Sequence, residues 1–351
     1  MAECLRLRLV KSELSILQRF PEPSIDEIIS GFAPPVQFSE VRFNNYLPDQ
    51  MHPSQTLSLN EMREFAYVIG RGSRASLFRK RPQGKRGRYL DGGFGVGKTH
   101  LLAALWHEVT VSKLYGTFVE YTNLVGLLGF HNAVEVLSRF NLICIDEFEL
   151  DDPGDTVLMS TLLMRLVEKG AFLAATSNTL PDRLGEERFA AENFQREIQG
   201  LAEHFDTLRI DGEDYRHRDL EHFPSPVTDL TLERVSQQYN FETVVFADVS
   251  QHLSALHPSR YRFLLADCQG LGFKHVETIT NQDVALRWVV FIDRLYDLSV
   301  PIAYSGSNLN ELFGDELLKG GYRKKYRRAL SRIVALAQVG QESWSIQDSN
   351  L

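Results

Sequence analysis

The chain has 351 residues, which is more than one ordinary domain of ~100–200 residues contains, so two or three domains are expected. With 43% hydrophobic and 24% charged residues, the composition supports a sizeable core and excludes global disorder. The 38 Lys and Arg residues against 46 Asp and Glu residues give a formal charge of −8, which excludes a protein that coats nucleic acid by bulk charge.

The cysteines and the apolar segments favour a cytoplasmic protein. Cys4, Cys144 and Cys268 are few and far apart, so they predict neither a disulfide framework nor a metal knuckle. No stretch reaches the ~18 consecutive apolar residues of a membrane span. The first twenty residues mix acidic with basic side chains and lack the apolar run of a secretory signal. We expect an amphipathic helix there, with a mitochondrial targeting helix as the alternative.

The N-terminal part of the chain predicts an arm, a helix and a basic linker. Residues 21–55 are rich in Pro, Ser and Asn and contain spaced aromatics, which is typical of an extended arm lying on a globular body. A helix is expected over residues 58–68. Residues 71–88 contain eight basic and no acidic residues. Such a stretch could follow a phosphate backbone, but a charge run is usually a solvated face.

From residue 88 onward, short apolar runs alternate with helical stretches, which predicts parallel βαβ units. Strands are expected over residues 88–91, 117–121, 142–146, 172–176 and 207–210, and helices over residues 98–111 and 156–168. Pro224 and Pro226 mark a domain boundary within residues 220–231.

The rest of the chain predicts a smaller α/β region. Strands are expected over 244–249, 275–279 and 301–305, a helix capped by Asn281 is expected to run to about residue 298, and a last helix is expected over 322–338. The predicted domains are therefore residues 1–85 (arm, helix and linker), 86–220 (core) and 221–351. The fold class is α/β, with a parallel-sheet core and helices on both faces.

The strongest motif, GGFGVGKT at residues 92–99, matches G-x-x-x-x-G-K-[ST] between an expected strand and an expected helix. Its glycines let backbone N–H groups turn toward phosphates, and the helix N-terminus adds its positive dipole end. Lys98 is expected to reach the β- and γ-phosphates and the Thr99 hydroxyl to bind Mg²⁺. The predicted ATP-binding residues are Gly92, Gly93, Phe94, Gly95, Val96, Gly97, Lys98, Thr99 and His100.

A second motif, Asp146-Glu147, follows the apolar run 141–145. A buried parallel strand delivers such carboxylates at its carboxyl edge. We expect Asp146 to hold the water shell of Mg²⁺ and Glu147 to orient or deprotonate the attacking water. A water-activating base predicts an ATP hydrolase and distinguishes the chain from a kinase or a simple G-domain.

Asn178 ends a third apolar run, residues 174–177. It is expected to sense the γ-phosphate and the attacking water, provided that its strand lies between the strands of the first two motifs. The alternative is a turn-forming Asn before Pro181.

Arginines near the last core strand are candidates for transition-state stabilisation. Arg196 is expected to reach the γ-phosphate of a neighbouring subunit, with Arg183 and Arg188 as competitors and a surface salt bridge as the alternative. Arg216 and Arg218 are expected to serve the nucleotide of their own subunit. No Cys/His cluster or nucleophile motif appears, so Mg²⁺ is the one metal predicted.

With the segments LICIDEF, LLMRLVEKGAFLAATSN, NFQREI and DGEDYRHR, the chain resembles the ZapE-type ATPases, bacterial cell-division proteins with mitochondrial relatives. The resemblance runs from about residue 88 to residue 336, and the opening arm is similar to the actinobacterial branch. It implies an AAA+-like P-loop core, ATP hydrolysis, the cytoplasm or the inner membrane face, nucleotide-dependent homo-oligomers and the division tubulin FtsZ as partner. It also implies functional roles for Gly97, Lys98, Thr99, Asp146, Glu147, Asn178 and Arg196.

The sequence departs from the family at a few positions. His217 replaces the usual Leu between two arginines, and Ala329 and Ala335 replace Thr and an acidic residue near the end. These changes leave nucleotide binding untouched, but the roles of Arg216, Arg218 and Arg332 and the partner surface stay open.

Three functions are compatible with these motifs. The first is an ATP-driven remodeller of a protein at the division site. The second is a DNA-associated helicase loader or initiator, which residues 97–102 also resemble, although the net charge disfavours nucleic acid. The third is a nucleotide-gated scaffold, which the intact Lys98, Asp146 and Glu147 disfavour.

Overall fold

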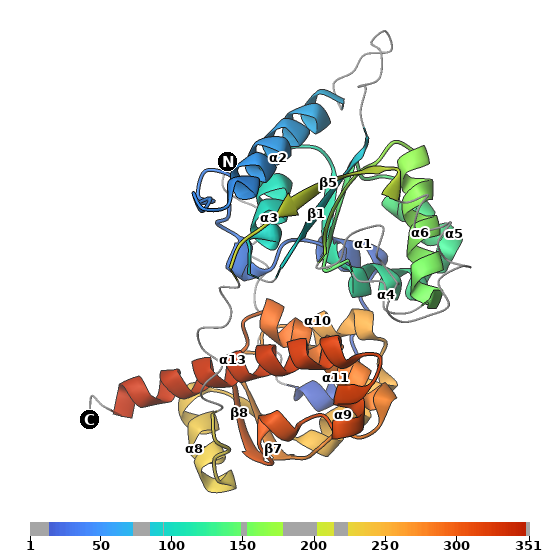
Figure 1. Cartoon of the computed structure of the whole chain (residues 1–351). Helices are drawn as coiled ribbons and strands as arrows, with labels where there is room; N and C mark the ends of the chain where they lie inside the picture. The colour runs from blue at the N-terminus through green and yellow to red at the C-terminus, as the bar shows by residue number, and fades with distance from the viewer. Residues whose placement is uncertain are drawn as a thin grey trace, which may run out of the picture. The chain divides into compact units, whose positions relative to one another are not determined.

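The computed structural model describes residues 14–72, 85–93, 95–148, 153–177, 202–213 and 224–348. The chain divides into two compact units, Ile25–Asp219 and Met1–Ser24 together with Leu220–Leu351 (Figure 1). We call the first the P-loop unit and the second the C-terminal unit.

The described part of the P-loop unit alternates strands with helices, as the sequence predicts. Its elements in chain order are α1 (Ile25–Ser30), the 3₁₀ helix η2 (Val36–Phe38), α2 (Pro53–Gly72), β1 (Gly87–Gly92), α3 (Lys98–Glu108), β2 (Lys113–Thr117), α4 (Phe118–Leu128), α5 (Phe130–Leu137), β3 (Leu142–Asp146), α6 (Pro153–Glu168), β4 (Phe172–Ser177) and β5 (Phe205–Ile210).

The strands of this unit form one parallel sheet in the order β2-β3-β4-β1-β5. Every residue of β3 and β4 is buried, as expected for parallel strands covered on both faces. The predicted α/β fold with a parallel-sheet core is confirmed. Because β4 lies between β1 and β3, the carboxyl ends of the P-loop strand, the Asp146 strand and the strand that precedes Asn178 meet at one edge.

Helices cover both faces of the sheet (Figure 1). On one face, α2 and α3 pack their apolar side chains on the strands, and the ring of Phe65 lies 5.8 Å from that of Phe172. On the other face, α4, α5 and α6 pack together. The helix expected over residues 58–68 is longer at both ends and starts with Pro53, which suits the first helical position.

The prediction of a strand over residues 117–121 is wrong. The strand is β2, and Thr117 is instead the N-cap of α4. Its side chain accepts from the backbone N–H of Glu120, and the Glu120 carboxylate accepts from the backbone N–H of Thr117. This capping box starts a helix although Phe118, Val119 and Tyr121 favour strand.

The described members of the basic stretch bind groups of their own unit. Lys85 donates to the carbonyl of Phe205, and the guanidinium of Arg86 lies 4.8 Å from the Phe172 ring centroid. The guanidinium of Arg88 lies 4.6 Å from the Phe65 ring centroid and pairs with Asp206. These cations therefore stabilise the sheet and α2.

The C-terminal unit has a separate parallel sheet in the order β6-β7-β8. Its described elements are η1 (Ile16–Gln18), α8 (Asp229–Tyr239), β6 (Glu242–Val245), α9 (Phe246–Ala255), η6 (Pro258–Arg260), α10 (Tyr261–Leu264), β7 (Leu271–Val276), α11 (Gln282–Asp297), β8 (Ile302–Gly306), η7 (Leu309–Glu311), α12 (Asp315–Lys319) and α13 (Arg323–Asp348).

Two expected strands of this unit are displaced. The run 244–249 ends as strand at Val245 because α9 begins at Phe246, whose ring stacks on that of Trp288 at 4.4 Å. The strand expected over 275–279 is β7, and near its end His275 takes a left-handed φ of 56° that interrupts the ladder. The predicted Asn281 cap is confirmed, since its side chain accepts from two backbone N–H groups at the start of α11.

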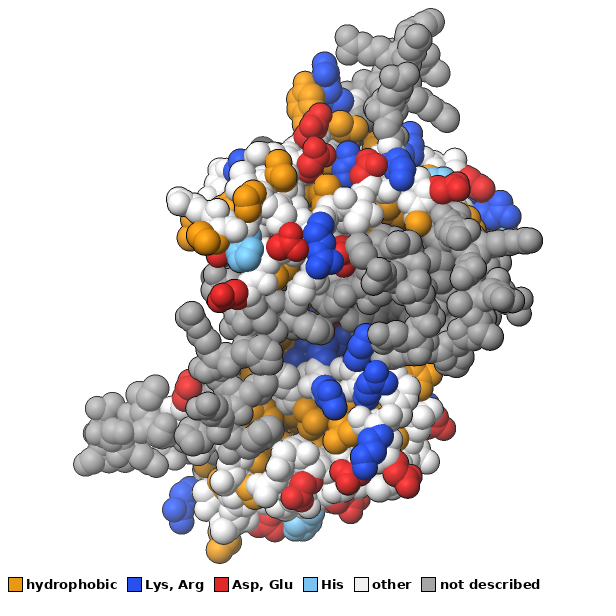
Figure 2. Space-filling view, in the orientation of Figure 1, with side chains coloured by type: hydrophobic (Ala, Val, Ile, Leu, Met, Phe, Trp, Pro, Cys, Tyr) orange, Lys and Arg blue, Asp and Glu red, His pale blue; other side chains and the backbone are white. Residues whose placement is uncertain are grey.

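Residues 14–24 pack on the C-terminal unit, whereas α2 packs on the P-loop unit, so the units do not follow the expected boundary at residue 85. Arg19 donates to the carbonyls of Leu264 and Ala266, and the backbone N–H of Ile16 donates to Glu242 at 2.6 Å. Figure 2 shows Lys and Arg side chains on the visible face of this unit. The first ten residues of α13 include six Lys and Arg residues.

Candidate nucleotide-binding site

The loop between β1 and α3 has the backbone that its motif predicts. Gly95 and Gly97 have φ angles of 72° and 91°, in the left-handed region that favours glycine. A Cβ on Gly97 would lie 2.6 Å from the ring of Tyr46, so this position has no room for a side chain. Gly97 is also the N-cap of α3, which points the helix N-terminus at the loop. Phe94 lies outside the described residues.

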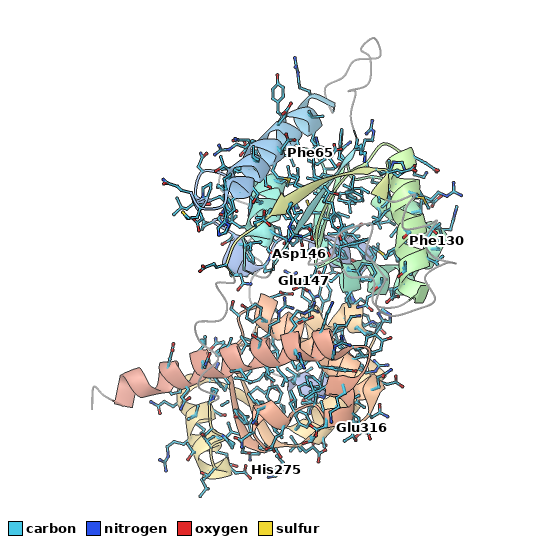
Figure 3. All side chains as sticks on the ribbon, viewed as in Figure 1. Phe65, Phe130, Asp146, Glu147, His275 and Glu316 are labelled. Atoms are coloured by element: carbon cyan, nitrogen blue, oxygen red, sulfur yellow. The ribbon has the colours of Figure 1, made fainter. Side chains whose placement is uncertain are left out.

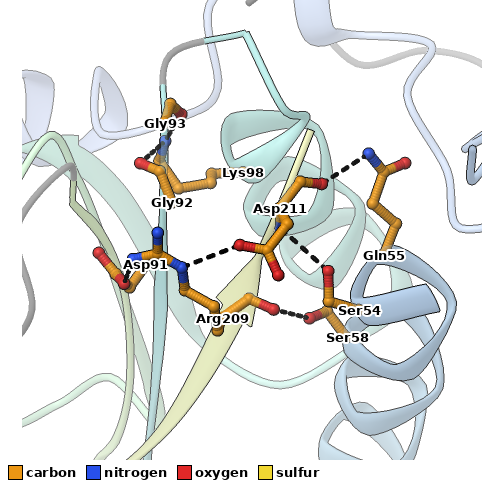
Figure 4. Close-up of polar contacts among 9 residues, drawn as sticks. All are labelled: Ser54, Gln55, Ser58, Asp91, Gly92, Gly93, Lys98, Arg209 and Asp211. Carbon is orange, nitrogen blue, oxygen red and sulfur yellow. Dashed lines mark hydrogen bonds and ion pairs between the residues drawn. The ribbon is translucent and has the colours of Figure 1, made fainter. Parts of the chain in front are cut away.

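Lys98 points its ammonium group back at this loop. Its side chain is buried, and Nζ donates to the carbonyls of Gly92, at 2.9 Å, and Gly93 (Figure 4). The only positive charge of the motif is thus held beside the backbone that cradles phosphates in loops of this kind. The glycine-rich backbone, the N-terminus of α3 and the buried Lys98 ammonium together fit the phosphates of a nucleoside triphosphate.

Thr99 and Asp146 meet at the start of α3 and the end of β3. Thr99 Oγ1 donates to Asp146 Oδ1 at 3.2 Å. A hydroxyl and a carboxylate oxygen at one point are hard ligands, the donor set that fits Mg²⁺. Burial, and then the adjacent Glu147 carboxylate, raise the pKa of Asp146 above its ordinary value, while the hydroxyl groups that donate to it lower it.

Two buried hydroxyls that the sequence analysis missed hold Asp146 in place. Tyr115 in β2 donates to Asp146 Oδ2 at 2.9 Å, and Thr176 in β4 donates to Oδ1. Burial, and then the charge of Asp146, raise the pKa of Tyr115 well above its ordinary value, so the phenol stays protonated as a donor. A hydroxyl within the apolar run FLAAT was the available signal for Thr176, whereas Tyr115 gave none.

Glu147 lies beside Asp146 at the carboxyl edge of the sheet (Figure 3). Its φ angle is 54°, a left-handed conformation that is uncommon for a residue with a side chain. Its backbone N–H lies 3.0 Å from Thr176 Oγ1 and 3.2 Å from Asp146 Oδ1. The Asp146 carboxylate and the Glu147 backbone thus belong to one hydrogen-bonded group.

A second polar group ties α2 to the same edge (Figure 4). The buried Asp91, directly before the loop, accepts from Arg209 of β5 at 2.5 Å, and Arg209 also donates to Asp211. Gln55 Nε2 donates to the carbonyl of Asp211 at 2.9 Å, and Ser54 accepts from its N–H. The start of α2 is therefore fixed to the end of β5.

His100 turns toward the arm. Its Nε2 lies 3.2 Å from the carbonyl of Arg42, and its ring lies 5.2 Å from that of Tyr46. Burial lowers the pKa of His100, against the hydrogen bond to Arg42, which raises it. Tyr46 also donates to the carbonyl of Val96 at 3.3 Å, so the arm contacts the loop itself.

The remaining predicted site residues fall into two groups. One group lies outside the described residues: Asn178, Arg183, Arg188, Arg196, Arg216 and Arg218. The other is Arg332, which donates to Asp293 at 2.5 Å within the C-terminal unit.

A family model described as AFG1-like ATPase matches residues 27–241 and 233–342 of the chain. The cell division protein ZapE of Escherichia coli strain K12 is 25% identical over 298 residues, which cover 71% of this chain and 77% of that protein. Lactation elevated protein 1 homolog B of Danio rerio is 25% identical over 166 residues, 40% of this chain and 33% of that protein. A crystal structure of DnaI is similar with a TM-score of 0.41 and 18% identity, over 51% of this chain and 93% of that one. The family match reaches from the P-loop unit into the C-terminal unit.

Hydropathy gives one further finding. Within the ranges that the structure describes, no helix combines the length and the apolar character needed to cross a membrane.

Proposed function

The chain belongs to the AFG1-like ATPase family and is an ATP-hydrolysing P-loop enzyme, and from this premise we propose that it uses ATP to remodel a protein partner in cell division. The observation that carries the ATP-dependent part of the proposal is the convergence at one sheet edge. Lys98 and Thr99 face the loop and Asp146, and Glu147 adjoins them as a candidate base.

Each described residue of this edge has a proposed task. Lys98 binds the β- and γ-phosphates, and Thr99 with Asp146 holds Mg²⁺, partly through water. When bound, the ion neutralises charge that develops on the phosphates. Glu147 orients the attacking water and accepts its proton, because this half-buried residue follows Asp146 at the carboxyl edge of the sheet.

Residues outside the described ranges complete the proposed site. Asn178 would sense the γ-phosphate, and its position one residue after β4, between β1 and β3, supports this role. We propose that Arg196 reaches the nucleotide of a neighbouring subunit and that Arg216 and Arg218 bind the nucleotide in their own subunit. This assignment requires a nucleotide-dependent homo-oligomer.

The proposed client is the division tubulin FtsZ. The E. coli relative is named a cell division protein, which supports a task at the division site, in the cytoplasm or peripherally at the inner membrane face. A motor whose base is removed while its phosphate-binding groups stay intact should remain bound to ATP and hold its client.

The test is co-sedimentation of Glu147→Gln with FtsZ polymers in ATP and Mg²⁺. We expect ATP-dependent co-sedimentation of this variant and none of Lys98→Ala, which cannot load nucleotide. If neither variant sediments above background while Glu147→Gln retains bound ATP, FtsZ is not the client. Capture of a DNA fragment, with an affinity that falls steeply with salt, would instead support a helicase loader.

A further inference from the structure

We propose that Thr176 is a positioning residue. It fixes the backbone of Glu147, the candidate base, and links this residue to Asp146, the carboxylate proposed to hold Mg²⁺. The inference rests on the proposed role of Glu147 in hydrolysis. It concerns a residue of β4, two positions before the candidate sensor Asn178, whose hydroxyl bonds to Asp146 and to the Glu147 backbone.

Glu147 needs an external restraint. Its φ of 54° is a strained conformation for a residue with a side chain, and it persists only where the surrounding structure imposes it. β3 ends at Asp146, so no strand ladder fixes the backbone beyond that residue. The direction of the Glu147 side chain, and with it the position of the base, depends on what holds the next two N–H groups.

Thr176 holds both of these groups. Its Oγ1 accepts the backbone N–H of Glu147 at 3.0 Å, and its carbonyl accepts that of Phe148 at 2.7 Å. The regular pairing of β3 with β4 ends at Ile145 opposite Ala175, so Thr176 extends the pairing by one residue with its side chain. The Phe148 ring, packed edge-on against Tyr89 and Phe118, anchors the turn from the other side.

The same hydroxyl donates to Asp146 Oδ1. A threonine hydroxyl has one proton to give and lone pairs to accept, so it can serve Asp146 and Glu147 at once. Thr176 and Asp146 are both buried, which leaves water no place to substitute for the hydroxyl. Valine has nearly the same shape without these two hydrogen bonds. The Glu147 N–H would then keep only Asp146 Oδ1, at 3.2 Å, of its two acceptors, while the bond from the Phe148 N–H to the backbone carbonyl of residue 176 persists.

The experiment measures ATP turnover and the Kd of a fluorescent ATP analogue with Mg²⁺ for Thr176→Val and Thr176→Ser. We expect kcat at saturating Mg²⁺ to fall about 10–100-fold in the valine variant, the scale seen when partners that orient site ligands are lost, with the Kd at saturating Mg²⁺ unchanged. Because the bond to Asp146 Oδ1 is lost as well, the Mg²⁺ concentration for half-maximal turnover should also rise. Serine keeps the hydroxyl and should restore turnover. The matched control is Thr243→Val, a strand threonine of the C-terminal unit whose hydroxyl donates to Ser236, and it should hydrolyse ATP normally.

A double mutant separates positioning from general damage. If Thr176 acts through Glu147, Thr176→Val combined with Glu147→Gln should be no slower than Glu147→Gln alone. Losses that multiply, or a valine variant with parental kcat, overturn the inference. Parental turnover in Glu147→Gln would instead overturn the proposed base. Should the valine variant fail to unfold cooperatively, Thr176→Cys replaces it, with the same expected loss of kcat.

Tyr115→Phe provides a contrast within the same group. It removes the bond to Asp146 Oδ2 but leaves both bonds to the Glu147 and Phe148 backbone. We therefore expect it to raise the Mg²⁺ concentration for half-maximal turnover while kcat at saturating Mg²⁺ stays near the parental value. Equal loss of kcat in Tyr115→Phe and Thr176→Val would show that the Glu147 backbone is not what Thr176 controls.

Discussion

At the scale of single residues, the site consists of side chains whose freedom is small. Lys98 is buried and bonded to the loop, and Asp146 accepts from hydroxyls on both sides. Groups fixed before the substrate arrives need little rearrangement when charge develops on the phosphates. We therefore expect some substitutions at this site to change the affinity for ATP and others to change the rate of hydrolysis.

Lys98→Ala should remove ATP binding while the fold persists. A hydrogen bond to a charged group contributes ~1.5–3 kcal/mol, so we expect binding at least about 10–100-fold weaker, with turnover lost as a consequence. The measurement is titration with a fluorescent ATP analogue. Lys169→Ala removes an exposed lysine of the same unit and should bind normally. Parental affinity in Lys98→Ala would contradict the assignment.

Glu147→Gln should bind ATP and fail to hydrolyse it. A carboxamide cannot accept a proton from water, and general bases contribute about 10²–10⁴-fold, so kcat should drop by that factor with little change in Kd. Phosphate release measures turnover. Glu135→Gln, an exposed change in α5, is the control and should keep the parental rate. A Glu147→Gln rate equal to it would show that another group activates the water.

At the scale of elements, specific polar contacts join helices to strands and to one another. The start of α2 is fixed to β5 by Ser54 and Gln55, and Thr117 caps α4. In the C-terminal unit, α11 and α13 are joined by Asp293, which accepts from Arg328 at 3.0 Å and from Arg332. These contacts fix how the elements pack.

Asp293→Asn should destabilise the C-terminal unit. Burial alone would raise the pKa of Asp293, but the charges of Arg332 and Arg328 outweigh it and hold the pKa below its ordinary value. Removing one member of a buried charge group costs ~3–5 kcal/mol, because the guanidinium groups lose their partner. Urea unfolding at neutral pH should show this loss. Glu316→Gln, an exposed change in α12, should cost less than ~1 kcal/mol.

The ion pairs of Asp293 with Arg328 and Arg332 also predict a pH dependence of stability. Because the folded pKa is lowered, Asp293 stabilises the protein above the ordinary Asp value of ~3.9 and loses this contribution as the pH falls through the folded pKa. The free-energy difference between the parent and Asp293→Asn should therefore shrink only below about pH 4. A difference that is constant down to the acid transition would mean that Asp293 does not titrate there.

At the scale of the whole molecule, the proposed reaction needs a second subunit. Arg196 precedes the last core strand, and in P-loop motors an arginine at a subunit boundary stabilises the charge on the transferred phosphate. The C-terminal unit has its own sheet and core.

Arg196→Ala should bind ATP normally and lose ~10³-fold or more in turnover, the scale of arginine-finger effects. Mixing it with Lys98→Ala should restore part of the activity, because an intact pocket can then meet an intact arginine from the other variant. Light scattering verifies that mixed oligomers form. Activity that stays at the single-variant level in such oligomers would remove Arg196 from the trans role.

The sequence alone determined the features that neighbouring residues encode. The loop at residues 92–99, the strand Leu142–Asp146 and the Asn281 cap depend on side chains a few positions apart, so their patterns predict them. Where two local signals compete, as at Thr117, the strand-forming residues misled the prediction and the capping box decided the structure.

The tertiary structure alone decided which strands are neighbours and which distant side chains meet. The hydroxyls of Tyr115 and Thr176 lie 31 and 30 residues from Asp146 in sequence, and they reach it only because β2 and β4 flank β3. The packing of α2 with the sheet and of residues 14–24 with the C-terminal unit likewise depends on contacts between distant segments. Hydrogen bonds and packing act through space, so chain order and local periodicity do not specify them.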